Sequence, residues 1–220
     1  MNYLSSVEVE PNTKATASVI WLHGLGADGH DFEPIVAELN LPKNLAIRFV
    51  FPHSPSIPVT INGGMIMPAW YDILDMSIDR KVDLQQLDIS AGAVQALIDR
   101  EIERGIDASR IIIAGFSQGG AVAYQATLTY SQPLAGLLVM STYFATKDTI
   151  QIHDSNKKIS INIMHGSLDP VVSSVLGEQA LKALVNIGFE PRYKQYVMQH
   201  NVCAEQISDI SDWLQERLIV

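Results

Sequence analysis

The sequence has 220 residues, of which 47% are hydrophobic and 18% charged, and it carries a formal net charge of −9 at pH 7. This composition is typical of a folded globular protein, and the length favours a single α/β domain over 1–220 rather than disorder. The acidic balance excludes nucleic acid as an expected partner, because binding to phosphates requires clusters of lysine and arginine.

The first half of the chain alternates short apolar runs with helical patterns. Apolar and β-branched runs predict buried strands at 16–22 and 46–51, with a short helix near 32–39 between them. A long helix is predicted over 84–103, because its apolar side chains recur at every third or fourth position.

Residues 52–77 follow neither a helical nor a strand pattern. The segment holds four prolines and two adjacent glycines, and its apolar residues Met65, Ile66 and Trp70 look exposed. A loop of this length in a compact domain is usually functional or mobile. We expect a flap beside a functional site; the alternative is a β-hairpin that covers part of the core.

The second half repeats the alternation of strand and helix. Strands are predicted at 111–114, 134–140, 159–164 and 193–197, and helices follow Ser117, span 174–185 and close the chain. This order predicts a mostly parallel central sheet with helices on both faces. Ligands of such sheets bind at the carboxyl ends of the strands, so functional residues are expected there.

The most informative motif is G-F-S-Q-G-G at 115–120, which follows an apolar run and precedes a helical one. G-x-S-x-G at such a junction is typical of a nucleophile elbow, in which small residues permit a strained turn that exposes the serine hydroxyl. Ser117 is therefore the candidate nucleophile. The alternative is a Gly/Ser turn that only packs the helix against the strand.

A serine nucleophile needs a histidine base, and the base needs an acid that orients it. In hydrolases with this elbow the chain order is serine, acid, histidine. Asp169 and His200 each follow a predicted strand and complete that order, whereas His165 is expected to be a packed residue at a strand end. The alternative for Asp169 is a turn residue, since Asp-Pro often opens a turn.

A glycine-rich loop, H-G-L-G at 23–26, follows the first predicted strand. In elbow hydrolases this loop supplies a backbone N–H to the oxyanion hole, and the residue after the nucleophile supplies another. We assign these donors to Leu25 and Gln118. The side chain of His23 is expected to make structural hydrogen bonds.

The cysteine content and the N-terminal residues indicate the cellular compartment of the protein. Cys203 is the single cysteine, which excludes an internal disulfide and fits a reducing cytoplasm. It is expected to be a small core residue, because no second histidine–acid pair accompanies it. The first eight residues lack a secretory signal, and no apolar run approaches the roughly 20 residues of a membrane span, so a cytoplasmic protein is expected.

Taken together, the motifs resemble the phospholipase/carboxylesterase family of small α/β-hydrolases, which includes the acyl-protein thioesterases. The resemblance is carried by H-G-L-G at 23–26, M-P-A-W-Y-D at 67–72, G-F-S-Q-G-G at 115–120, H-G at 165–166 and D-P-V-V at 169–172. It implies an α/β-hydrolase fold, a catalytic triad of Ser117, Asp169 and His200, and an oxyanion hole formed by Leu25 and Gln118.

The resemblance also implies where a substrate binds. The Trp70 region with Met65, together with Val171 and Val172, would line an acyl-binding groove. Family members act as monomers or dimers and need no metal or cofactor. Gln199 and Asn201 depart from the small residue that usually precedes the family's catalytic histidine and from the serine or glutamate that often follows it.

These patterns predict a serine hydrolase that cleaves carboxylic esters or thioesters of a hydrophobic acyl group through an acyl-enzyme. Expected substrates are small esters, lysophospholipids or S-acylated proteins. One alternative is an inactive protein that keeps the fold for binding. Another is a lipid-binding protein that contacts the membrane surface through residues 52–77, and such peripheral contact is compatible with catalysis.

Overall fold

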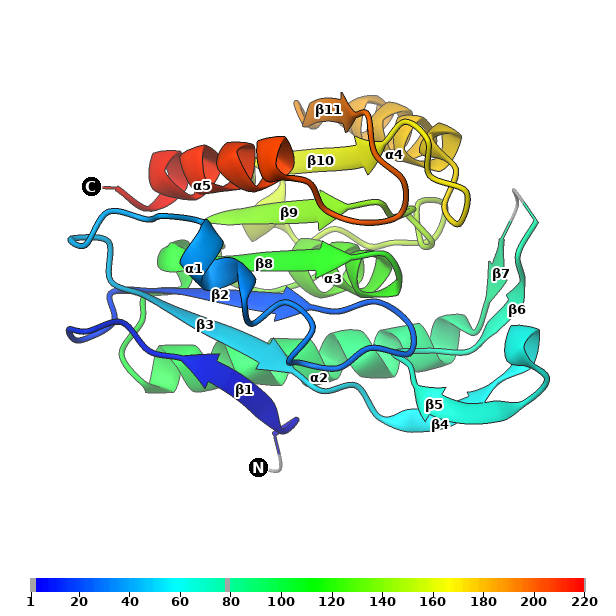
Figure 1. The fold of residues 1–220 in the computed structure, drawn as a ribbon, viewed down its shortest axis with the longest axis horizontal. Coiled ribbons are helices and arrows are strands. Elements are labelled where there is room, and N and C mark those ends of the chain that lie inside the picture. Colours follow the sequence, from blue (N-terminus) through cyan, green and yellow to red (C-terminus); the bar gives the residue numbers. More distant parts are fainter. Residues whose placement is uncertain (1–2, 78–79, 220) are drawn as a thin grey trace.

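The computed structural model describes residues 3–77 and 80–219. Residues 1–2, 78–79 and 220 lie outside this description. Within the described ranges, seven strands form one sheet in the order β1-β3-β2-β8-β9-β10-β11 (Figure 1). Their bounds are β1 (Ser6–Val9), β2 (Ala17–Leu22), β3 (Ile47–Pro52), β8 (Ile111–Phe116), β9 (Gly136–Met140), β10 (Ile161–Gly166) and β11 (Arg192–Tyr196).

The prediction of a mostly parallel sheet is confirmed. Neighbouring strands from β3 to β11 pair in parallel. The edge strand β1 is the exception in this sheet, because it pairs with β3 in the antiparallel direction. Every residue of β2, β8, β9 and β10 is buried, as expected for strands that are covered on both faces. The sequence patterns had indicated all of these strands except β1, whose residues are only half-buried.

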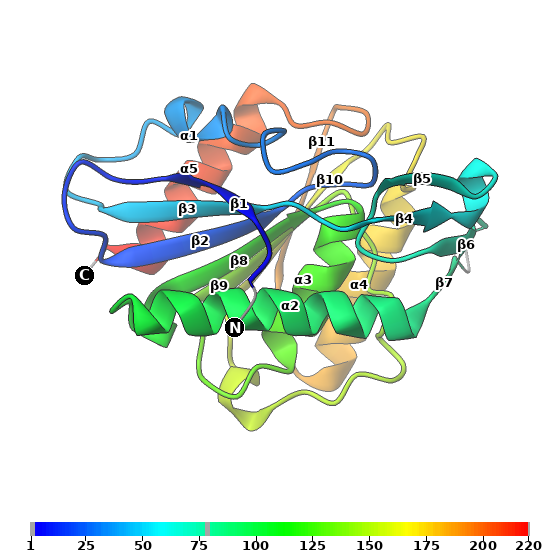
Figure 2. The same cartoon turned by 90° about the horizontal axis from the view of Figure 1, so that it is seen from below.

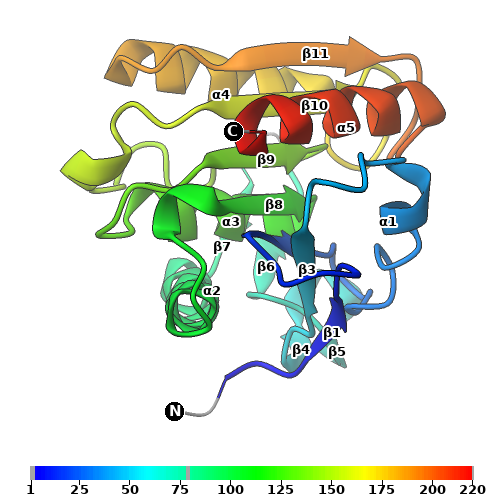
Figure 3. The same cartoon turned by 90° about the vertical axis from the view of Figure 1, so that its left-hand side faces the viewer.

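Helices cover both faces of the sheet, as predicted. α1 (Ile35–Glu38) and α5 (Ala204–Leu218) pack on one face, and α2 (Leu84–Glu103), α3 (Gln118–Leu128) and α4 (Ser174–Ile187) pack on the other (Figures 2 and 3). Short 3-10 turns occur at Thr60–Asn62, Ala108–Arg110 and Asp154–Asn156. Among the helices of the described residues, none combines the length and the hydropathy of a membrane-spanning segment.

The sheet separates two apolar cores. One contains the buried side chains of α2, α3 and α4, and the other contains those of α1 and α5. Helix α2 has the predicted bounds because Asp83 caps it, accepting a hydrogen bond from the Gln86 N–H, while Leu87, Val94 and Leu97 bury its apolar stripe. These cores fix the strands whose carboxyl ends form one edge of the sheet.

A buried carboxylate joins α2 to the sheet. Glu101 accepts hydrogen bonds from Ser18 Oγ at 2.6 Å, Arg48 Nη1 at 2.7 Å and Arg104 Nη1 at 2.8 Å. Burial raises the pKa of Glu101, but the hydrogen bonds from Ser18 and Arg48 and the charge of Arg104 outweigh it, so the pKa is lowered. The group therefore stays ionised at neutral pH.

Residues 52–77 contain regular strands although their sequence follows no strand pattern, and they include a β-hairpin, which was the alternative interpretation of this segment. β4 (Ser56–Val59) and β5 (Met65–Pro68) form an antiparallel hairpin, and β6 (Ile73–Asp75) pairs with β7 (Lys81–Val82). Gly63 and Gly64, with φ of 67° and 78°, allow the chain to reverse direction between β4 and β5. A two-stranded hairpin has only edge strands, which tolerate proline, and this is why the prolines did not prevent pairing.

The hairpin has an exposed tip and a buried base. Met65 and Ile66 are 62% and 70% exposed, whereas Trp70 is 1% exposed, so the expectation that Trp70 is exposed is wrong. Figure 1 shows the hairpins beyond the carboxyl ends of the strands. The segment thus combines both readings of the sequence, since its base covers part of the core and its tip lies free at the edge where a site is expected.

Candidate active site

Ser117 occupies a strained turn between β8 and α3. Its φ of 52° and ψ of −121° lie outside the regions that L-residues normally adopt. The Ser117 N–H donates to Met140 O at 2.9 Å, and Thr142 Oγ1 donates to Ser117 O at 2.6 Å. These bonds to the end of β9 hold the turn in place.

The glycines of the motif are required by close packing. A Cβ atom at Gly115 would lie 2.5 Å from Gly119 O, and one at Gly119 would lie 2.4 Å from His23 O. Only residues without a side chain allow α3 to begin this close to β2 and β8. The sharp turn predicted from G-x-S-x-G is therefore present, and it brings the loop after β2 beside Ser117.

His200 joins the other two predicted residues. Its Nε2 lies 3.0 Å from Ser117 Oγ, and its Nδ1 lies 2.7 Å from Asp169 Oδ2. An Nδ1–H that donates to the carboxylate leaves Nε2 free to accept the serine proton. The ring also packs on Phe116, with 4.7 Å between centroids. Three side chains from separate parts of the chain thus meet at the carboxyl edge of the sheet.

Asp169 is a turn residue as well as a partner of His200. Its Oδ1 accepts hydrogen bonds from the N–H groups of Val171 and Val172, both at 2.8 Å. Burial raises the pKa of Asp169, but the hydrogen bond from His200 and those from the two N–H groups outweigh it, so the pKa is lowered. The two interpretations of Asp169 are compatible, because one oxygen holds the turn and the other holds the imidazole.

The other two buried histidines make structural contacts, as expected. His165 Nε2 donates to Val172 O at 2.8 Å, and His23 has its Nδ1 at 2.7 Å from Gly24 O and accepts from the Ser54 N–H at 3.2 Å. Burial lowers the pKa of both imidazoles, which keeps them neutral at pH 7.

The two predicted oxyanion donors come from the two segments that meet at Ser117. Gln118 is the first residue of α3, and Leu25 lies in the loop after β2. Within residues 3–77 and 80–219, the backbone N–H of neither residue donates to an acceptor. A Cβ at Gly24 would lie 3.4 Å from Ser117 Cβ, so this loop lies beside Ser117.

Sequence reasoning missed the side chain of Gln118. Its Oε1 accepts from the Trp70 N–H at 2.9 Å, and its Nε2 donates to Tyr71 O at 2.7 Å. The Trp70 indole N–H donates in turn to His23 O at 2.9 Å. A glutamine at the start of an apolar helix signals that a polar partner exists, but its spacing does not identify the partner.

The predicted acyl-binding residues divide into two pairs. Trp70 and Val172, at 1% and 0% exposed, are buried, and their place in an acyl-binding groove stays a prediction. Their backbone and indole groups hold the loops beside Ser117. Met65 and Val171, at 62% and 44% exposed, remain available to a substrate.

Two cavities lie near these loops. One of about 480 Å³ includes Phe116 and His200 in its lining, and another of about 650 Å³ lies between α4 and residues 143–148. Arg80 lines the larger cavity and donates from Nη2 to Val171 O at 2.7 Å, next to Asp169. Among the residues described, no group of three or more histidine, cysteine, aspartate or glutamate side chains could hold a metal ion.

Comparison with known proteins identifies a family and relatives of this chain. A model of the phospholipase/carboxylesterase family matches residues 5–218. The chain is 37% identical to acyl-protein thioesterase 1 of Neurospora crassa over 214 residues, which cover 92% of this chain and 87% of that protein. It is 34% identical to acyl-protein thioesterase 1 of Cryptococcus neoformans, with 98% of each chain covered.

The chain belongs to the phospholipase/carboxylesterase family. Solved structures of similar fold include Zea mays acyl-protein thioesterase 2, with a TM-score of 0.86 and 28% identity over 98% of this chain and 100% of that one. Arabidopsis thaliana SOBER1 has a TM-score of 0.86 and 30% identity, with 92% of this chain and 99% of that one covered.

Membership of the phospholipase/carboxylesterase family confirms two predictions. The fold is that of an α/β-hydrolase. The protein is a serine hydrolase that acts on carboxylic esters or thioesters.

Proposed function

We propose that Ser117 is the nucleophile of this hydrolase, with His200 as its general base and Asp169 as the residue that orients the imidazole. The proposal rests on one observation, the continuous hydrogen-bonded line from Ser117 Oγ through His200 to Asp169, with distances of 3.0 and 2.7 Å. Such a line allows a proton to leave the hydroxyl as it attacks, while the carboxylate stabilises the imidazolium that forms.

The chemistry follows from these positions. Ser117 Oγ bonds to the carbonyl carbon while its proton moves to His200 Nε2, and the N–H groups of Leu25 and Gln118 stabilise the resulting oxyanion. His200 then protonates the leaving thiol or alcohol, and the C–S or C–O bond breaks to give an acyl-serine. Water, deprotonated by His200, attacks this ester and releases the carboxylic acid.

S-acylated proteins and acyl esters are the proposed substrates. Relatives named acyl-protein thioesterase match this chain over nearly its full length. The acyl group would contact the apolar side chains of Met65 and Val171, which are both exposed. A cytoplasmic location, favoured by the lone free thiol, belongs to the same proposal, as does a monomeric or homodimeric state.

The exposed hairpin tip supports a second role, peripheral contact with a membrane. Met65 and Ile66 place two large apolar side chains at the end of a hairpin that protrudes from the sheet. Sedimentation with lipid vesicles tests this role. We expect the double variant Met65→Ser/Ile66→Ser to bind vesicles less than the wild type, and unchanged binding would count against membrane contact.

Hydrolysis of acyl thioesters tests the main proposal. Wild type and Ser117→Ala are compared on S-acyl thioesters and p-nitrophenyl esters with acyl chains from acetyl to palmitoyl. We expect turnover that depends on chain length for the wild type, and a loss of about 10⁶ in kcat for the folded variant. Turnover by Ser117→Ala near the wild-type rate would refute the assignment.

A further inference from the structure

A cavity of about 480 Å³ lies beside His200, between α1 and the segment that leads from β11 into α5. Its apolar lining includes Phe32, Ile35, Phe116, Val202 and Ile207. The Phe116 ring packs against the His200 ring, so the cavity and the proposed active site share a wall. The volume is within the range of pockets that hold small ligands.

The chemistry of acyl transfer decides what this side of His200 must accommodate. A general acid must lie within hydrogen-bond reach of the atom that it protonates, about 3 Å. In the proposed mechanism His200 protonates the leaving group, so the leaving thiol or alcohol departs on the His200 side of Ser117. His200 itself is part of the cavity lining, so the cavity can hold the part of the substrate attached to the leaving atom.

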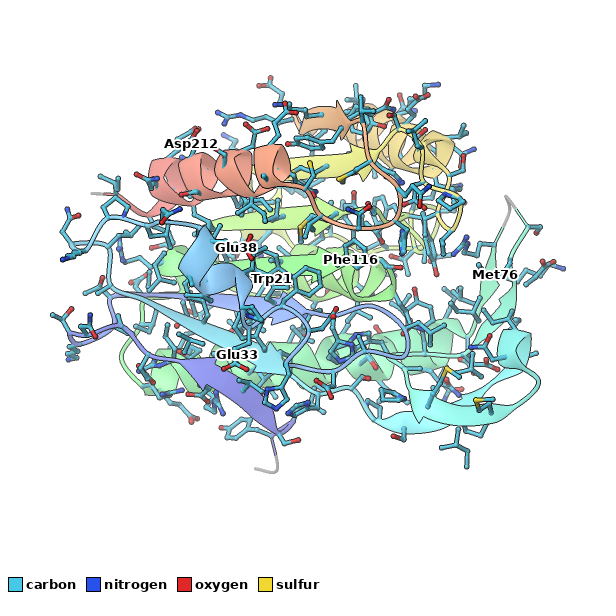
Figure 4. The ribbon with its side chains drawn as sticks, viewed as in Figure 1. Trp21, Glu33, Glu38, Met76, Phe116 and Asp212 are labelled. Atoms are coloured by element: carbon cyan, nitrogen blue, oxygen red, sulfur yellow. The ribbon has the colours of Figure 1, made fainter. Side chains whose placement is uncertain are left out.

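The charges of the lining indicate which leaving groups fit. Asp31 and Glu38 are exposed members of the lining, which includes no lysine or arginine. Within the described ranges neither carboxylate has an ion-pair partner, in contrast to neighbouring Glu33, which lies 2.8 Å from His30 Nδ1. Figure 4 labels two residues of the lining, Glu38 on α1 and Phe116 at the end of β8.

We infer that this cavity is a leaving-group subsite that prefers a positively charged thiol, and that its occupant is a basic peptide segment around an acylated cysteine. The inference rests on the proposed function and specifies its substrate. The apolar lining would receive the aliphatic parts of the peptide, and Asp31 and Glu38 would pair with lysine or arginine. A choline phospholipid also carries a cation, but its phosphate would be repelled by both carboxylates and by the net charge of −9.

Two thioesters with one acyl group separate charge from shape. Octanoyl thiocholine carries a trimethylammonium leaving group, and the octanoyl thioester of 3,3-dimethylbutanethiol is its neutral isostere. We expect the wild type to prefer the cationic thioester in kcat/KM by about fivefold, after correction for the uncatalysed rates, and the preference to shrink in high salt. The parameter kcat/KM is used because the leaving group departs during acylation.

The double variant Asp31→Asn/Glu38→Gln tests the residues. It should lose about fivefold in kcat/KM on the cationic thioester and stay within twofold of wild type on the neutral one. The control Glu190→Gln/Asp212→Asn removes the same formal charge from exposed positions outside the lining and should change neither value. All four positions are exposed, so folding should be retained, which urea unfolding checks.

Two further substrates distinguish the source of the cation. On an octanoylated cysteine peptide that contains lysine, the double variant should lose activity as it does on thiocholine, and on lysophosphatidylcholine it should not. Equal losses on both substrates would overturn the peptide assignment. Absence of any cation preference in an active wild type, or an equal loss in the control, would overturn the subsite while the hydrolase function stands. Full activity of Ser117→Ala would instead refute the proposed function.

Discussion

The side chain of Gln118 accepts a hydrogen bond from the backbone N–H of Trp70, with 2.9 Å between Oε1 and N. Gln118 follows the candidate nucleophile, and Trp70 lies at the base of the β4–β5 hairpin. Trp70 also donates to His23 O, and Gly26 donates to Pro68 O at 2.8 Å. The hairpin base therefore braces both segments that carry the proposed oxyanion donors.

Replacement of Gln118 by leucine tests this bracing. It leaves the buried Trp70 N–H and Tyr71 C=O without partners, so we expect a loss of about 3 kcal/mol in the free energy of unfolding. Displacement of the adjacent loops should lower kcat by roughly 10-fold to 100-fold. The matched control is Gln125→Leu, on the same helix, whose side chain bonds to an exposed aspartate. It should change the free energy of unfolding and kcat only slightly. Normal kcat in Gln118→Leu would contradict the bracing role.

The strain at Ser117 predicts an unusual order of stabilities. Its φ of 52° and ψ of −121° are accessible to glycine and costly for any residue with a Cβ. Ser117→Gly should therefore unfold at higher urea concentration than Ser117→Ala, by about 1 kcal/mol in free energy, although both variants should be inactive. An alanine variant at least as stable as the glycine variant would show that the turn is not strained.

Asp169→Asn tests the orientation of the imidazole. An amide can donate a hydrogen bond to His200 Nδ1, which favours the tautomer whose Nε2 already carries a proton and cannot act as base. We expect kcat to fall by about 10⁴ with the fold retained. Asp154→Asn, an exposed acid that pairs with Lys157, serves as control. A fall of less than tenfold for Asp169→Asn would argue against its role.

Glu101 makes stability depend on pH. Its pKa is lowered in the folded state, so its stabilising contribution is complete above the unfolded pKa of about 4.3 and is lost as pH falls through the folded value. Glu101→Gln should lower the free energy of unfolding by about 3 kcal/mol at pH 7. The gap between variant and wild type should narrow below about pH 4. Urea unfolding at several pH values measures this difference in the free energy of unfolding. A difference that grows as the pH falls would contradict the stabilising role of the ionised Glu101.

The fold was largely predictable because its strongest signals are local. The strands β2, β8, β9 and β10 are buried on both faces and appear as continuous apolar runs, and α2 has both a cap and a regular apolar stripe. The edge strand β1 was missed, and the β4–β5 hairpin was only the alternative interpretation of residues 52–77, because their pairing depends on contacts outside the pattern of their own residues.

The site also combines features that local sequence signals predict with features that depend on tertiary contacts. Chain order and the elbow motif were sufficient to predict that Ser117, Asp169 and His200 lie together, since residues after parallel strands meet at one edge of the sheet. Burial was not predictable. Trp70 looked like a surface aromatic residue, yet bonds to Gln118 and His23 fix it in the interior.

Covalent labelling tests the central claim most directly. A fluorophosphonate probe forms a stable bond with an activated serine, and peptide mass spectrometry identifies the residue. We predict an adduct on Ser117 of the wild type, no adduct in Ser117→Ala, and much slower labelling in His200→Ala. An adduct on a different serine, or an unchanged labelling rate in His200→Ala, would contradict the account.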